Sequence, residues 1–249
     1  ISRGEYGVLR ELGVDALRGD LASTEVARRA VEGVDVVYHV AAKAGVWGRR
    51  KDYVRSNLTA TRNLLDACRE AGVRRLVYTS SPSVVFDMED HVDLNESAPY
   101  PTRFYTHYSE TKAQAEQAVL AANGEALATV ALRPHLIVGP GDPHLVPRLI
   151  ARARAGALRQ VGRGGNFVDM TDVEDAARAH LLAGRLLREH GPAAACAGKP
   201  YFITQGEPVD LWNWIAELLK QLAIPFEPRP ISATLAWRIG AVLEGAYWL

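Results

Sequence analysis

A tyrosine and a lysine stand four residues apart in HYSETKAQAE, residues 107–116. If this segment is helical, Tyr108 and Lys112 lie one turn apart on the same face. An ammonium beside a phenol favours the phenolate, so we expect the pKa of Tyr108 to fall toward the range of a general acid or base. The alternative is an ordinary surface pair, because this spacing often occurs by chance. The surrounding sequence decides between the two.

A loop rich in hydroxyl groups, YTSSPSVVF at 78–86, comes before this segment. Serines also cluster in loops for turn formation alone. However, a serine after one strand, with a tyrosine and a lysine opening the next helix, suits hydride transfer to or from a carbonyl. Ser81 would hold the carbonyl oxygen and Tyr108 would donate or remove the proton. Lys112 would lower the tyrosine pKa and bind a cofactor ribose, and a nicotinamide would carry the hydride.

Short apolar runs rich in β-branched residues alternate with helical patterns along the first half of the chain. The runs at 34–42, 73–81 and 126–134 have the length and composition of buried parallel strands. The segment between the first two has one apolar helical face and ends at Gly72. This alternation predicts an α/β fold with a doubly wound parallel sheet, the Rossmann arrangement.

The pattern changes after about residue 139, where prolines at 140, 143 and 147 interrupt the chain. Helices are predicted at 145–156, 172–188 and 209–222, with a short strand at 200–204. We therefore predict a dinucleotide-binding domain over residues 1–138. Residues 139–249 would form a small substrate-binding cap that intermingles with the last sheet elements.

The composition excludes several classes of protein. Hydrophobic residues make up 48% of the 249 residues, which excludes intrinsic disorder, and the formal net charge of zero gives no indication of a nucleic-acid-binding surface. Cys68 and Cys196 lack metal-ligand spacing, so we expect no metal, reduced thiols and a cytoplasmic location. His39 and His180 are expected to be structural, and no apolar run is long enough to span a bilayer.

Two further loops should meet a ligand, because ligands of open parallel sheets bind beyond the carboxyl ends of the strands. Asp20, in RGDL at 18–21, would accept the amino group of an adenine, and the alternative role is a helix cap. The small residues of HVAAKAG at 39–45 would let the backbone approach a ligand closely.

Taken together, these motifs resemble the extended short-chain dehydrogenase/reductase family over nearly the whole chain. They are GDL at 19–21, HVAAKAG at 39–45, SNLTATRNLLDAC at 56–68, VYTSSPSVVF at 77–86, YSETK at 108–112 and LRPHLIVGPGD at 132–142. Within the family the chain is most similar to the 3β-hydroxysteroid dehydrogenase branch. KAGVWG, RPHLIVGPGDPHLVPRLI and GKPYFITQGEPV resemble the sterol-4α-carboxylate 3-dehydrogenases and the bacterial 2-alkyl-3-oxoalkanoate reductases.

The resemblance implies a role for each site residue. Ser81, Tyr108 and Lys112 would be catalytic. Asp20 and Leu21 would flank the adenine, Asn57 would hold the surroundings of the lysine through water, and other residues would line the cofactor, namely Ala41, Ala42, Lys43, Pro134 and His135. Three residues would meet the substrate, namely Ser83, a second hydroxyl candidate, Trp47 and His107. The alternative for His107 is an ordinary exposed loop residue.

The chain departs from the family at its beginning. The family opens with a strand and a glycine-rich turn that binds the pyrophosphate, and neither is present in this sequence. Ile1 aligns with the end of the second strand, so we interpret the chain as part of a longer protein. Arg3 then stands where a guanidinium would suit a 2′-phosphate, which favours NADP(H) over NAD(H).

The last residues, 231–249, are apolar except for Arg238 and Glu244. They predict either an amphipathic helix that borders a lipid-like substrate or touches a membrane surface, or a helix packed on its own core. The main hypothesis is an NAD(P)-dependent oxidoreductase acting on a hydrophobic 3-hydroxy or 3-keto compound, a steroid or a long-chain β-keto acid. A nucleotide-sugar epimerase or dehydratase and a non-catalytic NAD(P)-binding sensor are the alternatives. The resemblance also implies a homodimer formed through helices near 50–71 and 107–122.

Overall fold

The computed structural model describes residues 9, 11–45 and 47–248. It divides into two compact units, each considered separately below. The first unit contains Ile1–His135 and Asp175–Ile203, and the second contains Leu136–Glu174 and Thr204–Leu249. The first unit therefore takes its last helix and its last strand from a segment that follows the first part of the second unit.

A four-stranded parallel sheet forms the centre of the first unit, in the order β1-β2-β3-β8. The strands are β1 (Val37–His39), β2 (Arg75–Thr79), β3 (Ala128–Pro134) and β8 (Pro200–Ile203). Each lies within a run that the sequence predicted as a strand, so the α/β class and the parallel sheet are confirmed. Because all four strands are parallel, their carboxyl ends lie at one edge of the sheet.

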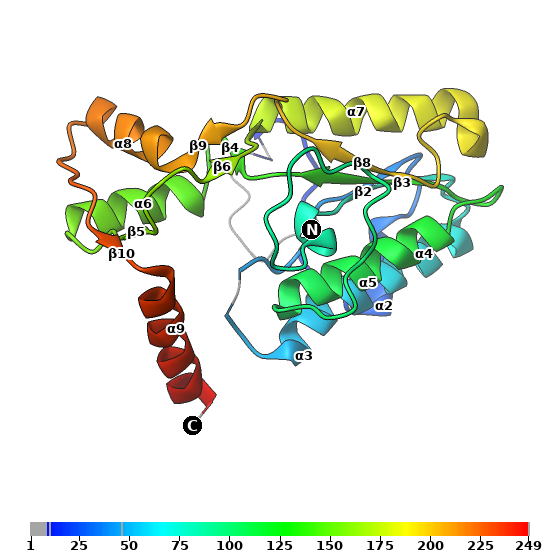
Figure 1. Cartoon of the computed structure of the whole chain (residues 1–249). Helices are drawn as coiled ribbons and strands as arrows, with labels where there is room; N and C mark the ends of the chain where they lie inside the picture. The colour runs from blue at the N-terminus through cyan, green and yellow to red at the C-terminus, as the bar shows by residue number, and fades with distance from the viewer. Residues whose placement is uncertain (1–8, 10, 46, 249) are drawn as a thin grey trace. The chain divides into compact units, whose positions relative to one another are not determined.

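Helices cover both faces of this sheet (Figure 1). One face carries α2 (Thr24–Ala30), α4 (Ala60–Ala71) and α5 (His107–Ala121), and the other carries α7 (Val173–His190). Every residue of β3 is buried, as expected for a central strand packed on both sides.

Local signals set the ends of the two long helices that flank the candidate site. The hydroxyl of Thr106 caps α5 by accepting a hydrogen bond from the backbone N–H of Ser109 at 3.1 Å. The predicted end of α4 at Gly72 is confirmed, with φ at 72°. Before α4, α3 (Arg50–Tyr53) continues into a π-helical segment, Val54–Thr59, which the sequence did not predict. Asn57 lies in this wider segment.

The second unit consists of three helices and short paired strands. The helices α6 (Leu145–Arg154) and α8 (Leu211–Gln221) confirm two predictions and share an apolar core. The strand pairs are β4 (Ile137–Val138) with β7 (Thr171–Asp172), β6 (Phe167–Val168) with β9 (Val209–Asp210), and β5 (Gln160–Val161) with β10 (Pro230–Ile231).

The predicted C-terminal helix is α9 (Ala233–Trp248). Its apolar side chains include Trp237 and Val242, each 72% exposed. Over the described part of the chain, no helix has both the length and the apolar character needed to cross a bilayer.

Candidate active site

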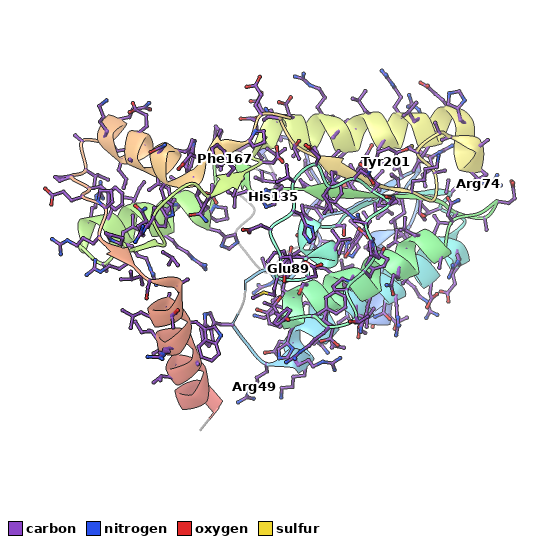
Figure 2. All side chains as sticks on the ribbon, in the orientation of Figure 1. Arg49, Arg74, Glu89, His135, Phe167 and Tyr201 are labelled. Atoms are coloured by element: carbon purple, nitrogen blue, oxygen red, sulfur yellow. The ribbon has the colours of Figure 1, made fainter. Side chains whose placement is uncertain are left out.

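The candidate site lies at the carboxyl edge of the four-stranded sheet, within the first unit. Figure 2 labels Arg74, just before β2, and His135, just after β3, which mark opposite ends of the sheet. Ser81 follows β2 by two residues, and α5 begins at His107. The fold therefore brings the loop after β2 and the first turn of α5 to the same edge.

Ser81 and Ser83 lie together in the turn after β2. Ser81 caps a short 3-10 helix, Pro82–Val85, and its Oγ accepts a hydrogen bond from the backbone N–H of Ser83 at 3.3 Å. The two hydroxyl oxygens are 3.0 Å apart, so they share one hydrogen bond. Both side chains are partly accessible. The turn therefore presents a pair of hydroxyls, one of which can donate outward while the other holds it in place.

The phenol of Tyr108 lies near Ser81. Burial raises the pKa of Tyr108 above its ordinary value, and the nearby Ser81 hydroxyl acts in the opposite direction. The prediction that Lys112 lowers this pKa is wrong for this arrangement of side chains. The reason is geometric, since the Lys112 ammonium donates to the backbone oxygen of Thr79 at 2.5 Å and lies 4.1 Å from the ring centroid of Tyr78.

Lys112 is a buried cation with mostly neutral neighbours. Its residue is 2% exposed, and burial lowers its pKa to about 7, while the charge of Glu116 acts to raise it. A lysine that titrates near neutrality can change charge at physiological pH, which is a property of functional rather than surface lysines.

Asn57 links the loop after β1 to α5. Its Oδ1 accepts from the backbone N–H of Lys43 at 2.7 Å, and its Nδ2 donates to the Lys43 oxygen at 3.2 Å and to the hydroxyl of Thr111 at 3.1 Å. Because Thr111 precedes Lys112, Asn57 fixes the loop and the lysine's helix relative to each other. This direct link goes beyond the predicted contact through water.

His39 and His180 are structural, as predicted. The ring of His39 hydrogen-bonds Thr61 at 2.8 Å, and that of His180 hydrogen-bonds Thr79 at 2.7 Å. Burial, with a smaller effect from the Lys112 charge, lowers the pKa of His39 to about 3, so this ring is neutral near pH 7. The described residues contain no cluster of side chains that could hold a metal ion.

Asp20 and Leu21 lie in the turn before α2. One Asp20 oxygen accepts from the backbone N–H of Ala22 at 3.0 Å, and the other forms an ion pair with Arg55 at 3.1 Å. Ser23, not Asp20, is the N-cap residue of α2, so the alternative role of Asp20 as that cap is wrong. Leu21 is buried in the core beneath. Arg3 lies outside the described residues.

The loop after β1 offers an open apolar surface. Val40 is 61% exposed, and Ala41 and Ala42 are also exposed. The buried Tyr53 supports the rest of this loop, because its hydroxyl is 2.8 Å from the backbone oxygens of both Gly45 and Trp47. Small exposed residues beside a tethered loop fit the close approach of a dinucleotide.

The remaining predicted residues are spread around this edge. The ring of His107 lies 6.2 Å from that of Tyr53, and the Trp47 residue is 51% exposed. Pro134 is buried at the end of β3, and the backbone N–H of His135 donates to the backbone oxygen of Ile203 at 3.3 Å. The donor set of Ser81, Tyr108 and Lys112, together with the small residues after β1, fits a nicotinamide dinucleotide.

A buried polar cluster behind the site escaped the sequence analysis. Arg133 donates to both carboxylate oxygens of Glu116, and the Tyr100 hydroxyl donates to the same carboxylate. The signal that could have found it is spacing, since Glu116 follows Lys112 by four residues on one helix face. Nothing in the sequence marks Arg133 as its partner.

Comparison with known proteins shows the family of the chain. The profile of the 3-beta hydroxysteroid dehydrogenase/isomerase family matches residues 6–231. A 2-alkyl-3-oxoalkanoate reductase of Stenotrophomonas maltophilia is 49% identical over 245 residues, which are 98% of this chain and 73% of that protein. The chain belongs to the 3-beta hydroxysteroid dehydrogenase/isomerase family. It is thus an NAD(P)-dependent dehydrogenase or reductase acting on CH–OH groups.

Other relatives show the same family and its range. The Shewanella oneidensis 2-alkyl-3-oxoalkanoate reductase is 45% identical over 255 residues, covering 100% of this chain and 65% of that protein. The Bos taurus decarboxylating sterol-4-alpha-carboxylate 3-dehydrogenase is 38% identical over 207 residues, covering 82% and 57%. The chain therefore spans about two thirds or less of the length of several relatives.

Solved structures show the same fold. MoeE5 in complex with UDP-glucose and NAD superposes with a TM-score of 0.73 at 28% identity, over 88% of this chain and 73% of that one. The crystal structure of gox2253 gives a TM-score of 0.78 at 24% identity, over 98% and 72%.

Proposed function

We propose that this family member transfers a hydride between a nicotinamide cofactor, NADP(H) in preference to NAD(H), and a hydrophobic 3-keto or 3-hydroxy acid. The proximity of Ser81 and Tyr108 at the carboxyl edge of the sheet, with Lys112 buried one helical turn after Tyr108, supports this reaction. The 49% identity to a 2-alkyl-3-oxoalkanoate reductase supports a long-chain β-keto acid as the substrate.

The nicotinamide would supply or accept the hydride, and residues of this chain would control the reacting oxygen. Ser81, held by Ser83, would donate a hydrogen bond to the carbonyl oxygen. Tyr108 would deliver the proton to that oxygen during reduction and remove it during oxidation. Lys112 would hold α5 against the end of β2 through its bond to the Thr79 oxygen, which keeps Tyr108 and Ser81 at the same edge of the sheet.

The test is a cofactor-oxidation screen. Oxidation of NADPH is compared with oxidation of NADH in the presence of each substrate class: 2-alkyl-3-oxoalkanoates, steroid ketones and UDP-sugars. We expect faster oxidation of NADPH with the long-chain β-keto acid. Conversion of a UDP-sugar with no net change of cofactor redox state would instead identify an epimerase. The likeness to MoeE5, solved in complex with UDP-glucose and NAD, is the reason to include UDP-sugars.

Two tyrosine variants test the catalytic assignment. Tyr108→Phe should lower kcat on the order of 10²- to 10⁴-fold, the usual contribution of a general acid or base. Tyr105→Phe is the matched control, because Tyr105 is 53% exposed in the loop just before α5 and should retain full activity. Full activity of Tyr108→Phe with every carbonyl substrate would refute the proposal and favour a non-catalytic sensor.

A further inference from the structure

A buried ion pair joins the catalytic helix to the centre of the sheet. Arg133 on β3 donates from Nε to Glu116 Oε2 at 3.0 Å and from Nη2 to Oε1 at 2.6 Å. The side chains are 2% and 0% exposed. The hydroxyl of Tyr100 donates to Oε1 at 2.6 Å, and the Arg133 guanidinium also lies 5.2 Å from the ring of Phe202.

Stability alone is a weak reason for this cluster. A buried ion pair carries a large desolvation cost, and well-packed apolar residues often serve as well or better. Among the described atoms, Arg133 Nη1 is buried and has no hydrogen-bond partner, which adds to the cost. A role beyond packing would account for the placement of a full negative charge at this point of α5.

The neighbours of Lys112 indicate what that role is. Lys112 faces the Thr79 oxygen and the Tyr78 ring from β2, and its charge acts on the neutral ring of His39 from β1. Tyr108 precedes Lys112 by one turn on α5. None of these groups is a carboxyl group. Glu116, one helical turn after Lys112, is one, and it is paired with Arg133.

We propose that Glu116 is a positioning residue whose buried carboxylate, fixed by Arg133 and Tyr100, keeps the Lys112 ammonium charged for its bond to the Thr79 oxygen. The inference rests on the proposed function for its catalytic meaning, but the charge coupling exists without substrate. The charge of Glu116 raises the pKa of Lys112, whereas burial lowers it. Arg133 and Tyr100 act on the carboxylate.

The direct test is a pH titration of lysine side chains by NMR in the cofactor-free protein, with ¹³C at Cε. The chain has only five lysines, so the spectrum is simple, and a Lys112→Arg variant assigns the signal. Glu116→Gln should lower the pKa of Lys112 by roughly one to two pH units, the effect of a unit charge about 6 Å away at an effective dielectric constant of about 20. Glu116→Asp should restore most of it.

The matched control is Glu110→Gln on the same helix. Glu110 also forms a two-bond pair with an arginine, Arg50, at 3.1 and 2.6 Å, but Arg50 is exposed and the pair lies outside the core. This variant should leave the Lys112 titration unchanged. Glu116→Gln alone leaves the buried Arg133 guanidinium unpaired. A double variant, Glu116→Gln with Arg133→Met, removes this unpaired charge and should also lower the Lys112 pKa.

The inference would be overturned if the Lys112 pKa were unchanged both in Glu116→Gln and in the double variant Glu116→Gln with Arg133→Met. The activity measurement extends it, since Glu116→Gln should move the alkaline limb of the kcat profile to lower pH, with little change in the KM for the cofactor. A wild-type protein without oxidoreductase activity, but with the shifted Lys112 titration, would refute the proposed function and leave the coupling standing. An active wild type whose Lys112 titration is not shifted by Glu116→Gln would support the proposed function and refute the coupling.

Discussion

Replacement of the buried lysine, Lys112→Met, should stabilise the protein at low pH and not at high pH. Burial lowers the pKa of Lys112 from 10.5 to about 7. At about 1.36 kcal/mol per pH unit, this difference disfavours the folded state by roughly 5 kcal/mol when the lysine is charged in both states. A folded pKa below the unfolded one means that this cost is fully present below pH 7 and disappears as the pH rises to about 10.5.

The magnitude for the variant follows from what methionine keeps and loses. Methionine has a similar length and fills irregular space, but it leaves the Thr79 oxygen without the donor that Lys112 supplies at 2.5 Å, at a cost of about 1–2 kcal/mol. The free energy of unfolding should therefore rise by about 3 kcal/mol at pH 6. At pH 10 the variant should be about 1 kcal/mol less stable than wild type.

The assay must report on the first unit. Of the five tryptophans only Trp47 lies there, so tryptophan fluorescence would follow mainly the second unit. Urea titrations at pH 6 and pH 10 should instead be followed by the methyl NMR signals of Val130 and Leu132 in β3. Lys51→Met, at an exposed position of α3, is the control and should change stability by less than about 0.5 kcal/mol. A stability difference between Lys112→Met and wild type that is the same at both pH values would refute the reasoning.

Three further predictions concern the groups around this lysine. Burial lowers the pKa of His39 from 6.5 to about 3, so the free energy of unfolding of wild type should fall by about 2 kcal/mol as the pH falls from 6.5 to 5. His39→Asn should remove this loss in urea titrations. Asn57→Leu should raise the KM for the cofactor and speed hydrogen exchange at residues 43–45, because it removes both bonds to Lys43. Arg50→Ala should change the unfolding free energy by less than about 1 kcal/mol, since its partner Glu110 can be solvated.

The sheet and the main helices could be predicted because their signals are local. β3 is buried along its whole length and appears in the sequence as a mostly apolar run, with Thr129 and Arg133 as the exceptions. The helix α5 begins after a capping hydroxyl, and α4 ends at a glycine. The order of strands and helices then requires Ser81 and Tyr108 to meet at one edge, because parallel strands end on the same side.

The electrostatics of the site could not be predicted in the same way. The i, i+4 spacing shows that Tyr108 and Lys112 share a helical face, but not where the flexible lysine places its ammonium. That choice depends on the Thr79 oxygen and the Tyr78 ring, which β2 brings to the helix through tertiary packing. Likewise, Glu116 and Arg133 are 17 residues apart in sequence and meet only because α5 packs against β3.

Burial acts on the two catalytic candidates in opposite directions, and this sets the requirement for the rest of the site. It raises the pKa of Tyr108, which favours the neutral phenol, and lowers that of Lys112 to about 7, which favours the neutral amine. Under the proposed function, a charged lysine forms the stronger bond to the Thr79 oxygen and so holds α5 at the end of β2. A third charge is then needed, and it must itself be buried, because an exposed one would be screened by water and salt. Glu116 meets that requirement, and its cost in stability is consistent with a site built for activity.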